Sequence, residues 1–248
     1  MTKIKDTALA LRGVNYSETS QVVTLLTREH GKIAAMAKGS RRPKSAFEGA
    51  IEPFAFGQVM FIPSPTDKLA TLTELVRIPR FRLLHTHLRA MYAGLFALEL
   101  TEAFCQEYDP HPALFDALVA ALEHLEQGDQ EVRVLSVLMD YQLTLLAEVG
   151  IAPVLDVCVN CGLAVTTTPK DLYFSSAANG LLCPGCEPSF ADKRRLSAAC
   201  AAVLNRSVPF DKAPTVAAEA ERALIYHFTE LLGRPPKMAK YVMEQNRT

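Results

Sequence analysis

The sequence of 248 residues predicts an α+β protein of two domains. We expect a small β-barrel over residues 1–80 and an all-α domain over residues 81–248, interrupted at 153–190 by a four-cysteine insert. Three observations support this fold class. Short β-branched runs separated by turn residues occupy the N-terminal third, helical periodicity begins near Leu83, and two Cys-x-x-Cys pairs interrupt the helical part.

The N-terminal segment has the pattern of five short strands. The predicted strands cover residues 8–13, 21–27, 32–38, 54–62 and 69–76. Turn-forming residues such as His30-Gly31 and Pro63-Ser64-Pro65 separate them. Five strands in about 75 residues favour a small closed barrel, and the OB fold is the commonest five-stranded barrel. An SH3-like barrel fits the same periodicity, so the pattern alone leaves both open.

From Leu83 onward the apolar residues recur with the period of helices. The predicted helices cover residues 84–108, 113–127, 130–149, 197–205, 217–232 and 237–245. Pro110 and Pro112 end the first of them, because proline cannot continue a helix. Gly128 and Gly150 follow the next two, as glycine often does at helix C-termini. Since helices resume after the cysteines, we expect the four-cysteine segment to be an insert within one helical domain.

The composition is that of a globular protein, with 49% hydrophobic and 21% charged residues. The N-terminus lacks the apolar core of a secretory signal, and the apolar run near residues 90–100 is broken by Arg89 and Glu99. Six cysteines are too few for a disulfide scaffold of this length, and Cys105 and Cys200 fit buried helical positions. We therefore expect a soluble protein of a reducing compartment, with no membrane partner.

The charge of the chain is polarised. Residues 1–82 contain thirteen Lys and Arg against seven Asp and Glu, a net charge of +6. The remaining residues then carry −7, since the whole chain carries −1. The sequence therefore predicts a basic N-terminal barrel followed by an acidic helical body.

The two Cys-x-x-Cys pairs have the spacing of a four-cysteine zinc site. Each pair folds into a tight turn that aims two thiolates at one point, and Gly162 and Gly185 suit such turns because glycine accepts positive φ. Four thiolates complete a tetrahedral shell and leave no position for a catalytic water, so we expect one structural Zn²⁺. The predicted ligands are Cys158, Cys161, Cys183 and Cys186.

Other chemistry at these cysteines is less well supported. Cys183-Pro184-Gly185-Cys186 has the form of one half of a zinc deaminase signature, but four cysteines already fill the shell. A redox Cys-x-x-Cys pair would stand in a βαβ unit, and neither pair does. The chain has no P-loop, dinucleotide fingerprint or nucleophile elbow. We expect no catalytic residues and no enzymatic activity.

A basic loop, defined here as residues 38–44, follows the third predicted strand. Its sequence is Lys38-Gly39-Ser40-Arg41-Arg42-Pro43-Lys44, and no acid occurs between Lys32 and Glu48. Charge runs of this length are usually solvated surface, but this run lies in a barrel of net charge +6. A basic barrel groove suits a phosphate backbone, and OB-type surfaces add aromatic platforms for bases. The candidate aromatic residues are Phe47, Phe54, Phe56 and Phe61.

These segments resemble the RecO family of recombination mediators. The resemblance is carried by residues 10–12, 16–20, 26–32, 53–54 and 69–72, by Ala37-Lys38-Gly39-Ser40-Arg41-Arg42, and in the insert by residues 153–158, 161–162, 174–175 and 180–183. The order of barrel, helices, cysteine insert and helices also agrees, so the resemblance covers nearly the whole chain. One departure is Ala178-Asn179-Gly180, where the family pattern leads us to expect paired glycines.

The resemblance implies a non-enzymatic function in bacterial DNA repair, in the cytoplasm at the nucleoid. It implies an OB-fold domain that binds single- and double-stranded DNA, annealing of complementary strands, and loading of recombinase onto coated single strands. The implied partners are RecR and the acidic C-terminal tail of single-stranded-DNA-binding protein, the latter bound by the helical domain. By match, the DNA-contacting residues are Lys32, Lys38, Arg41 and Arg42, with Lys44 added on charge alone.

The alternative from a different class is a zinc-dependent enzyme acting on RNA or DNA, or an OB-fold adaptor with a zinc site in translation or transcription. An enzyme needs an open metal position or an acid–base pair, which the sequence does not indicate. A preference for RNA over DNA would favour the adaptor.

Overall fold

The computed structural model of the chain describes residues 2–64, 69–165, 172–210 and 213–244. The chain forms two compact units. The barrel unit comprises residues 1–86 and 97–127, and the helical unit comprises residues 87–96 and 128–248. Helix α1 (Leu88–Phe104) contributes residues to both units. The division into functional domains 1–80 and 81–248 stays a prediction.

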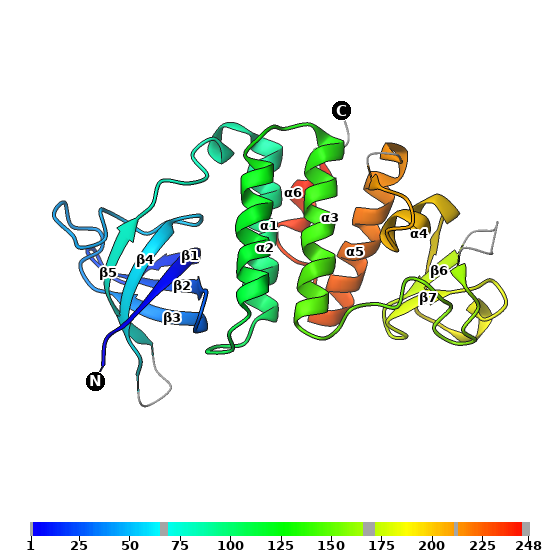
Figure 1. Cartoon of the computed structure of the whole chain (residues 1–248), viewed down its shortest axis with the longest axis horizontal. Coiled ribbons are helices and arrows are strands. Elements are labelled where there is room, and N and C mark those ends of the chain that lie inside the picture. The colour runs from blue at the N-terminus through cyan, green and yellow to red at the C-terminus, as the bar shows by residue number, and fades with distance from the viewer. Residues whose placement is uncertain (1, 65–68, 166–171, 211–212, 245–248) are drawn as a thin grey trace. The chain divides into compact units, whose positions relative to one another are not determined.

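Five strands of the barrel unit close into a barrel (Figure 1). They are β1 (Ile4–Asn15), β2 (Gln21–Thr27), β3 (Gly31–Ala37), β4 (Phe56–Ile62) and β5 (Ala70–Arg77). The order around the barrel is β1-β2-β3-β5-β4, with β3 and β5 parallel and every other neighbouring pair antiparallel. The long β1 pairs with β4 through its first half and with β2 through its second half. This arrangement confirms the predicted OB-type barrel.

The barrel core follows from the alternation of side chains along each strand. In β3 every second residue is buried, and β2 shows the same alternation up to Leu25. Ile33, Val59 and Phe61 are fully enclosed and form part of one hydrophobic cluster. The residues that alternate with the buried ones in β2 and β3, such as Thr24 and Lys32, are half-buried and lie on the outer face of the barrel.

Helix α2 (Pro112–Leu125) and the C-terminal half of α1 belong to the barrel unit. Arg28, directly after β2, donates two hydrogen bonds to the Asp116 carboxylate, from Nε at 3.0 Å and from Nη2 at 2.8 Å. This ion pair lowers the pKa of Asp116. The rings of Phe56 and Phe115 lie 6.2 Å apart between centroids. Polar and aromatic contacts therefore attach α2 to the barrel.

The helical unit is built around α3 (Glu131–Glu148) and α5 (Ala217–Leu232), which pack against each other. Shorter helices α4 (Ala198–Leu204) and α6 (Ala239–Glu244) complete it. Gly233 ends α5 with a left-handed φ of 65°, a conformation in which glycine carries no Cβ penalty.

The predicted helices agree with the observed ones to within about four residues at each end. The first begins later than predicted because a 3₁₀ turn, Leu84–Thr86, precedes α1. In the last predicted helix, 237–245, residue 245 lies outside the described residues. None of the helices in the described ranges is long and apolar enough to cross a membrane.

A small antiparallel sheet, which the sequence pattern did not predict, begins in the four-cysteine insert and extends past its C-terminal bound to residue 196. Its strands, in the order β7-β6-β8, are β6 (Leu172–Ser175), β7 (Gly180–Leu182) and β8 (Arg194–Leu196), of which β6 and β7 are labelled in Figure 1. Asn179, in the departure from the expected paired glycines, adopts a φ of 53° in the β6–β7 turn. Asparagine tolerates this left-handed conformation, so the turn forms without the second glycine.

Candidate nucleic-acid interface and metal centre

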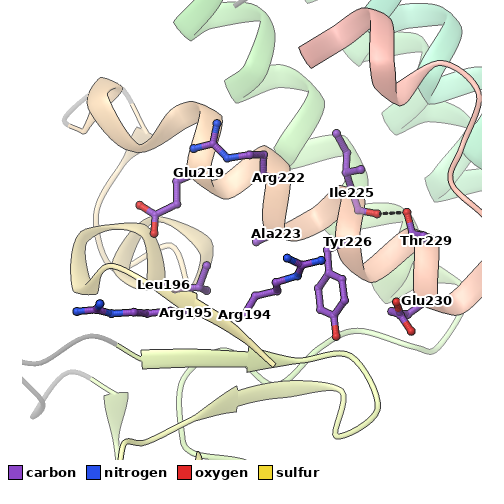
Figure 2. Close-up of a pocket in the computed structure, with 10 residues that line it drawn as sticks. All are labelled: Arg194, Arg195, Leu196, Glu219, Arg222, Ala223, Ile225, Tyr226, Thr229 and Glu230. Atoms are coloured by element: carbon purple, nitrogen blue, oxygen red, sulfur yellow. Dashed lines mark hydrogen bonds between the residues drawn. The ribbon is translucent and has the colours of Figure 1, made fainter. Parts of the chain in front are cut away.

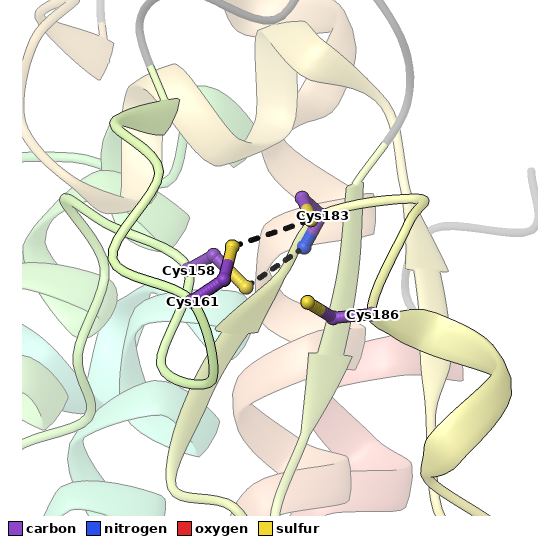
Figure 3. Close-up of side chains that lie close together, drawn as sticks. All are labelled: Cys158, Cys161, Cys183 and Cys186. Atoms are coloured by element: carbon purple, nitrogen blue, oxygen red, sulfur yellow. Dashed lines mark hydrogen bonds between the residues drawn. The ribbon is translucent and has the colours of Figure 1, made fainter.

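The four predicted metal ligands converge on one point in the helical unit (Figure 3). Cys158 and Cys161 come from the turn that precedes the small sheet, and Cys183 and Cys186 from the turn after β7. Their four Sγ atoms all lie within 4.8 Å of one another, and the Sγ atoms of Cys161 and Cys183 are 3.8 Å apart. In a tetrahedral shell with sulfurs about 2.3 Å from the ion, neighbouring sulfurs are about 3.8 Å apart. The donor set therefore fits one four-coordinate metal ion.

The two cysteine turns are built differently. Gly162 adopts a φ of 73° and its N–H donates to the Cys158 carbonyl at 2.8 Å, as its position in the sequence predicts. Gly185 does not adopt positive φ, so the expectation for the second turn is wrong. In that turn the Cys186 N–H donates to the Cys183 carbonyl at 3.0 Å, and the chain continues into the 3₁₀ helix Glu187–Ser189. A turn that leads into a right-handed helix requires no positive φ.

The electrostatics of the cluster favour a bound cation. Burial raises the pKa of Cys158, but N–H groups of Cys183, Cys161 and Asn160 outweigh it and lower the pKa to about 6. At Cys161 a hydrogen bond from Leu163 lowers the pKa, whereas the neighbouring thiols raise it to about 12. One thiolate is stabilised by backbone dipoles while further thiolates repel it. A divalent cation removes that repulsion, because metal-bound cysteines are deprotonated.

The remaining cysteines and the one His-x-Glu sequence are not members of this ligand set. Cys105 and Cys200 are buried as predicted, and burial raises their pKa values to about 11 and 12. His124-Leu125-Glu126 has the His-x-Glu spacing of the other half of a deaminase signature. It belongs to the barrel unit, where the Glu126 carboxylate accepts a hydrogen bond from the Leu83 N–H at 2.6 Å. The four sulfurs form a complete set without it.

The basic loop is fixed from within by two buried polar side chains. Ser40 is fully buried and donates from Oγ to the Gln21 Oε1 atom at 3.0 Å. Gln21 also accepts from the Ile51 N–H at 2.8 Å and donates to the Ile51 carbonyl at 3.3 Å. These bonds hold the loop in one conformation, while its four cationic side chains are exposed. The exposed cations are Lys38, Arg41, Arg42 and Lys44.

The basic loop is also bonded to the β1–β2 turn, residues 16–20. The Arg41 N–H donates to the Thr19 carbonyl at 3.1 Å, and the Gly39 N–H donates to the Ser20 Oγ at 3.2 Å. The Arg41 guanidinium reaches the Ser17 carbonyl at 3.4 Å. The turn and the loop therefore form one continuous surface at the end of the barrel.

Lys32 lies away from this surface. It is the second residue of β3, six residues before Lys38, which corresponds to about 20 Å of strand. Its Nζ donates to the Glu102 carbonyl of α1 at 2.6 Å and is partly buried. The structure therefore brings together four of the five predicted DNA-contacting residues and engages Lys32 in a bond to the helix.

The predicted aromatic platforms are all part of the core, whereas an unpredicted tyrosine is exposed. Phe47, Phe54, Phe56 and Phe61 are 3%, 5%, 7% and 0% exposed, so they offer no face to a base. Tyr16, in the β1–β2 turn, is 70% exposed. It lines an open hollow of about 410 Å³ between the turn and the basic loop. The other lining residues are Ser17, Ser20, Met36, Lys38, Gly39 and Arg42. The sequence signal that could have found Tyr16 is its position in the β1–β2 loop of an OB fold.

A second cationic site lies in the helical unit, between β8 and α5 (Figure 2). This arginine pocket has a volume of about 440 Å³ and is lined by Arg194, Arg195, Leu196, Glu219, Arg222, Ala223, Ile225, Tyr226, Thr229 and Glu230. The Arg194 guanidinium lies 4.8 Å from the centroid of the Tyr226 ring, in cation–π contact. The Tyr226 hydroxyl donates to Asp192 at 3.2 Å. Sequence reasoning missed this pocket because its arginines come from segments about 30 residues apart that only the fold brings together.

The chain thus combines an OB-type barrel, which carries an anchored basic loop, with helices and a four-cysteine centre. Comparison with known proteins identifies its family. The family model described as Recombination protein O N terminal matches residues 1–79, and Recombination protein O C terminal matches residues 85–240. The chain belongs to the RecO family of DNA repair proteins.

Relatives named DNA repair protein RecO support this assignment over almost the whole chain. The relative from Anaeromyxobacter sp. (strain K) is 33% identical over 244 residues, which cover 94% of this chain and 93% of the relative. The relative from Bacillus pumilus is 31% identical over 248 residues, covering 96% and 93%. The relative from Salinibacter ruber is 41% identical over 153 residues, which cover 62% of this chain and 58% of the relative.

Proposed function

We propose that this protein is a non-enzymatic mediator of DNA repair and homologous recombination. It binds single- and double-stranded DNA through the barrel, anneals complementary strands, and helps to load recombinase onto single strands coated by single-stranded-DNA-binding protein. The observation that supports DNA binding best is the anchored basic loop, where exposed cations stand on a backbone fixed by Ser40 and Gln21.

The chemistry of the loop suits phosphate rather than base recognition. Lys38 presents a compact ammonium, and Arg42 a planar guanidinium that matches the oxygens of a phosphate. Contacts of this kind position a strand without reading its sequence, which is what annealing of arbitrary complementary strands requires. Arg41 and Lys44 add charge along the same edge. Lys32 is the weakest member of the predicted set, because its ammonium already bonds to Glu102.

The test is a paired charge reversal. Lys38→Glu with Arg42→Glu removes two proposed phosphate contacts and leaves Arg41 to hold the β1–β2 turn. The control, Lys3→Glu with Lys5→Glu, makes the same charge change at two exposed residues near the start of β1. Affinity for single-stranded DNA is measured by fluorescence anisotropy across a range of salt concentrations.

We expect the loop variant to lose at least tenfold in affinity and its salt slope to fall by about 1.4, at about 0.7 for each lost contact. The control should retain the wild-type slope. Equal affinity and slope in the loop variant and the wild type would refute the assignment of the basic loop.

The proposed metal is one structural Zn²⁺ held by the four cysteines. The closed shell of four sulfurs opposes the alternative of a zinc-dependent enzyme, because a catalytic zinc keeps a position for water. Co²⁺ substituted for the native metal reports this directly. Intense thiolate charge-transfer bands with the d–d spectrum of a four-sulfur site support the proposal, and a spectrum that changes on addition of azide would show an open position. Competition between RNA and DNA of equal length tests the adaptor alternative.

The proposed protein partners are RecR and the acidic tail of single-stranded-DNA-binding protein. The arginine pocket supports an acidic peptide partner for the helical unit, since its lining has three arginines against two carboxylates and also includes apolar residues such as Leu196 and Ala223. The excess of positive charge attracts carboxylates, and the apolar residues accept apolar side chains. Binding of a fluorescent peptide copied from that tail should weaken at least tenfold on Arg195→Glu with Arg222→Glu. Binding unchanged by both substitutions would exclude this pocket.

A further inference from the structure

We propose that the hollow beside Tyr16 binds one unstacked nucleotide of single-stranded DNA, with the base on the Tyr16 ring and the flanking phosphates on Lys38 and Arg42. The inference rests on the proposed function and deepens it, because it names the side chain that lets the protein distinguish single-stranded DNA from duplex DNA. Phosphate contacts alone are available to both forms of DNA.

The first support is the exposure of Tyr16. The other barrel aromatics discussed above are enclosed, whereas Tyr16 is 70% exposed at the edge of the hollow. A large aromatic side chain on a solvent-facing turn contributes nothing to a core. Proteins that bind single strands use such rings as stacking surfaces, and every base offers a π-face to them.

The second support is the chemistry of the walls. Tyr16 and Met36 provide the apolar surface, and Lys38 and Arg42 provide positive charge. None of the seven lining residues carries a carboxylate. Glu18 is in the same turn but does not line the hollow. An apolar wall with two cations beside it fits a base whose neighbouring phosphates carry negative charge, and a volume of about 410 Å³ is in the range of small-ligand sites.

The third support is that the hollow is held in place before any ligand arrives. The Tyr16 N–H donates to the Ser20 carbonyl at 2.9 Å, and the Ser20 N–H donates to the Ser17 Oγ at 3.2 Å. Ser20 in turn accepts from Gly39, at the start of the basic loop. The ring and the two cations are thus carried on bonded segments, so little conformational entropy is lost when a nucleotide binds.

This geometry predicts a selective effect. In a duplex both faces of each base are stacked on neighbours, so the Tyr16 ring gains a partner only when the strand is single. Stacking on an aromatic side chain changes affinity by roughly 5- to 150-fold per base. Removing the ring should therefore weaken single-strand binding within that range and leave duplex binding within about twofold.

The experiment uses the full chain and a 15-nucleotide oligothymidine with one central 2-aminopurine, together with a duplex of equal length. Three variants are compared: Tyr16→Phe keeps the ring, Tyr16→Leu keeps apolar surface without a π-face, and Tyr16→Ala removes both. We expect Tyr16→Phe to bind and quench 2-aminopurine like the wild type. Tyr16→Ala and Tyr16→Leu should lose affinity for the single strand and lose the quenching, with an unchanged salt slope.

The outcomes separate the inference from the proposed function. If Lys38→Glu with Arg42→Glu lowers affinity and salt slope while Tyr16→Ala binds both DNA forms like the wild type, the inference is wrong and the DNA-binding function stands. The stacking proposal is also wrong if Tyr16→Ala loses equal affinity for single-stranded and duplex DNA, or if Tyr16→Leu quenches 2-aminopurine like the wild type. If the charge reversal changes nothing, the assignment of DNA binding to this loop fails, and the inference fails with it.

Discussion

The two functional regions of this protein differ in the direction in which their side chains point. The four cysteines point inward to a common centre, with sulfurs as close as 3.8 Å, and a metal ion there has no position left for a substrate. The cations of the basic loop point outward from a backbone whose polar groups are bonded inside the barrel. A closed ligand set stabilises a fold, whereas an open set of charges is available to a partner. Under the proposed function, the more regular sequence motif is therefore the structural one.

The largest expected effect concerns the cysteine centre. Cys183→Ser removes one of four ligands, and structural zinc sites contribute on the order of 10 kcal/mol to folding at neutral pH. We expect loss of bound metal and a strongly lowered unfolding temperature of the helical unit. Metal content by mass spectrometry and circular dichroism on heating measure both.

Cys183→Ser also tests whether the cysteine centre contributes to DNA binding. Because the cysteines belong to the helical unit, DNA binding by the barrel unit should remain within about threefold of wild type at a temperature where the barrel is folded. A variant that stays folded yet loses DNA binding would place the cysteine centre in the DNA interface.

A smaller effect is expected for a buried carboxyl group in the helical unit. Glu221 is 1% exposed, and burial raises its pKa to about 7, although a hydrogen bond from the Gln142 amide at 2.9 Å opposes the shift. Because the folded-state pKa is above the ordinary 4.5, the contribution of Glu221 to the free energy of unfolding is complete below pH 4.5. That contribution is lost as the pH rises through about 7. Glu221→Gln should remove this loss.

The measurement is urea unfolding of wild type and Glu221→Gln at pH 5 and pH 8. Relative to the variant, the wild type should lose on the order of 2 kcal/mol between the two pH values. His227 responds in the opposite direction, since burial lowers its pKa to about 4, but it is present in both proteins and cancels in the difference. Parallel pH profiles would contradict the buried, protonated state of Glu221.

The smallest expected effect tests the anchor of the basic loop. Ser40→Ala removes the hydrogen bond to Gln21, which should cost about 1 kcal/mol of stability and lower DNA affinity a few-fold, because the loop cations become less ordered. Lys44→Ala, on the exposed part of the same loop, should leave stability unchanged. Ser40→Ala with reduced stability and full DNA affinity would show that the anchor does not organise the DNA-binding surface.

Local patterns in the sequence were sufficient for much of the fold. The strand period and turn residues predicted all five barrel strands, with β2 at its observed bounds, and the cysteine spacing predicted the ligand set. These features depend on neighbours in the chain. The strands β6, β7 and β8 escaped prediction because they are three or four residues long, too short for a period to be visible.

The parts of the site that could not be predicted depend on tertiary contacts. The sequence offered four phenylalanines as base platforms and did not indicate Tyr16, and only the closed barrel shows that the phenylalanines face inward. Lys32 and Lys38 are equally basic in the sequence, yet one is bonded to α1 and the other is exposed. Sequence alone identifies the charge of a residue, and the fold decides which charges a ligand can reach.

The most direct test of the account compares the salt dependence of single-strand DNA binding for three proteins: wild type, Lys38→Glu with Arg42→Glu, and Cys183→Ser. We predict that the loop variant loses at least tenfold in affinity and about 1.4 in slope, while Cys183→Ser, measured below its unfolding temperature, keeps the wild-type slope. A wild-type slope in the loop variant would contradict the assignment of DNA binding to the basic loop of the barrel. A slope in Cys183→Ser that falls as much as in the loop variant would contradict a purely structural role for the cysteines.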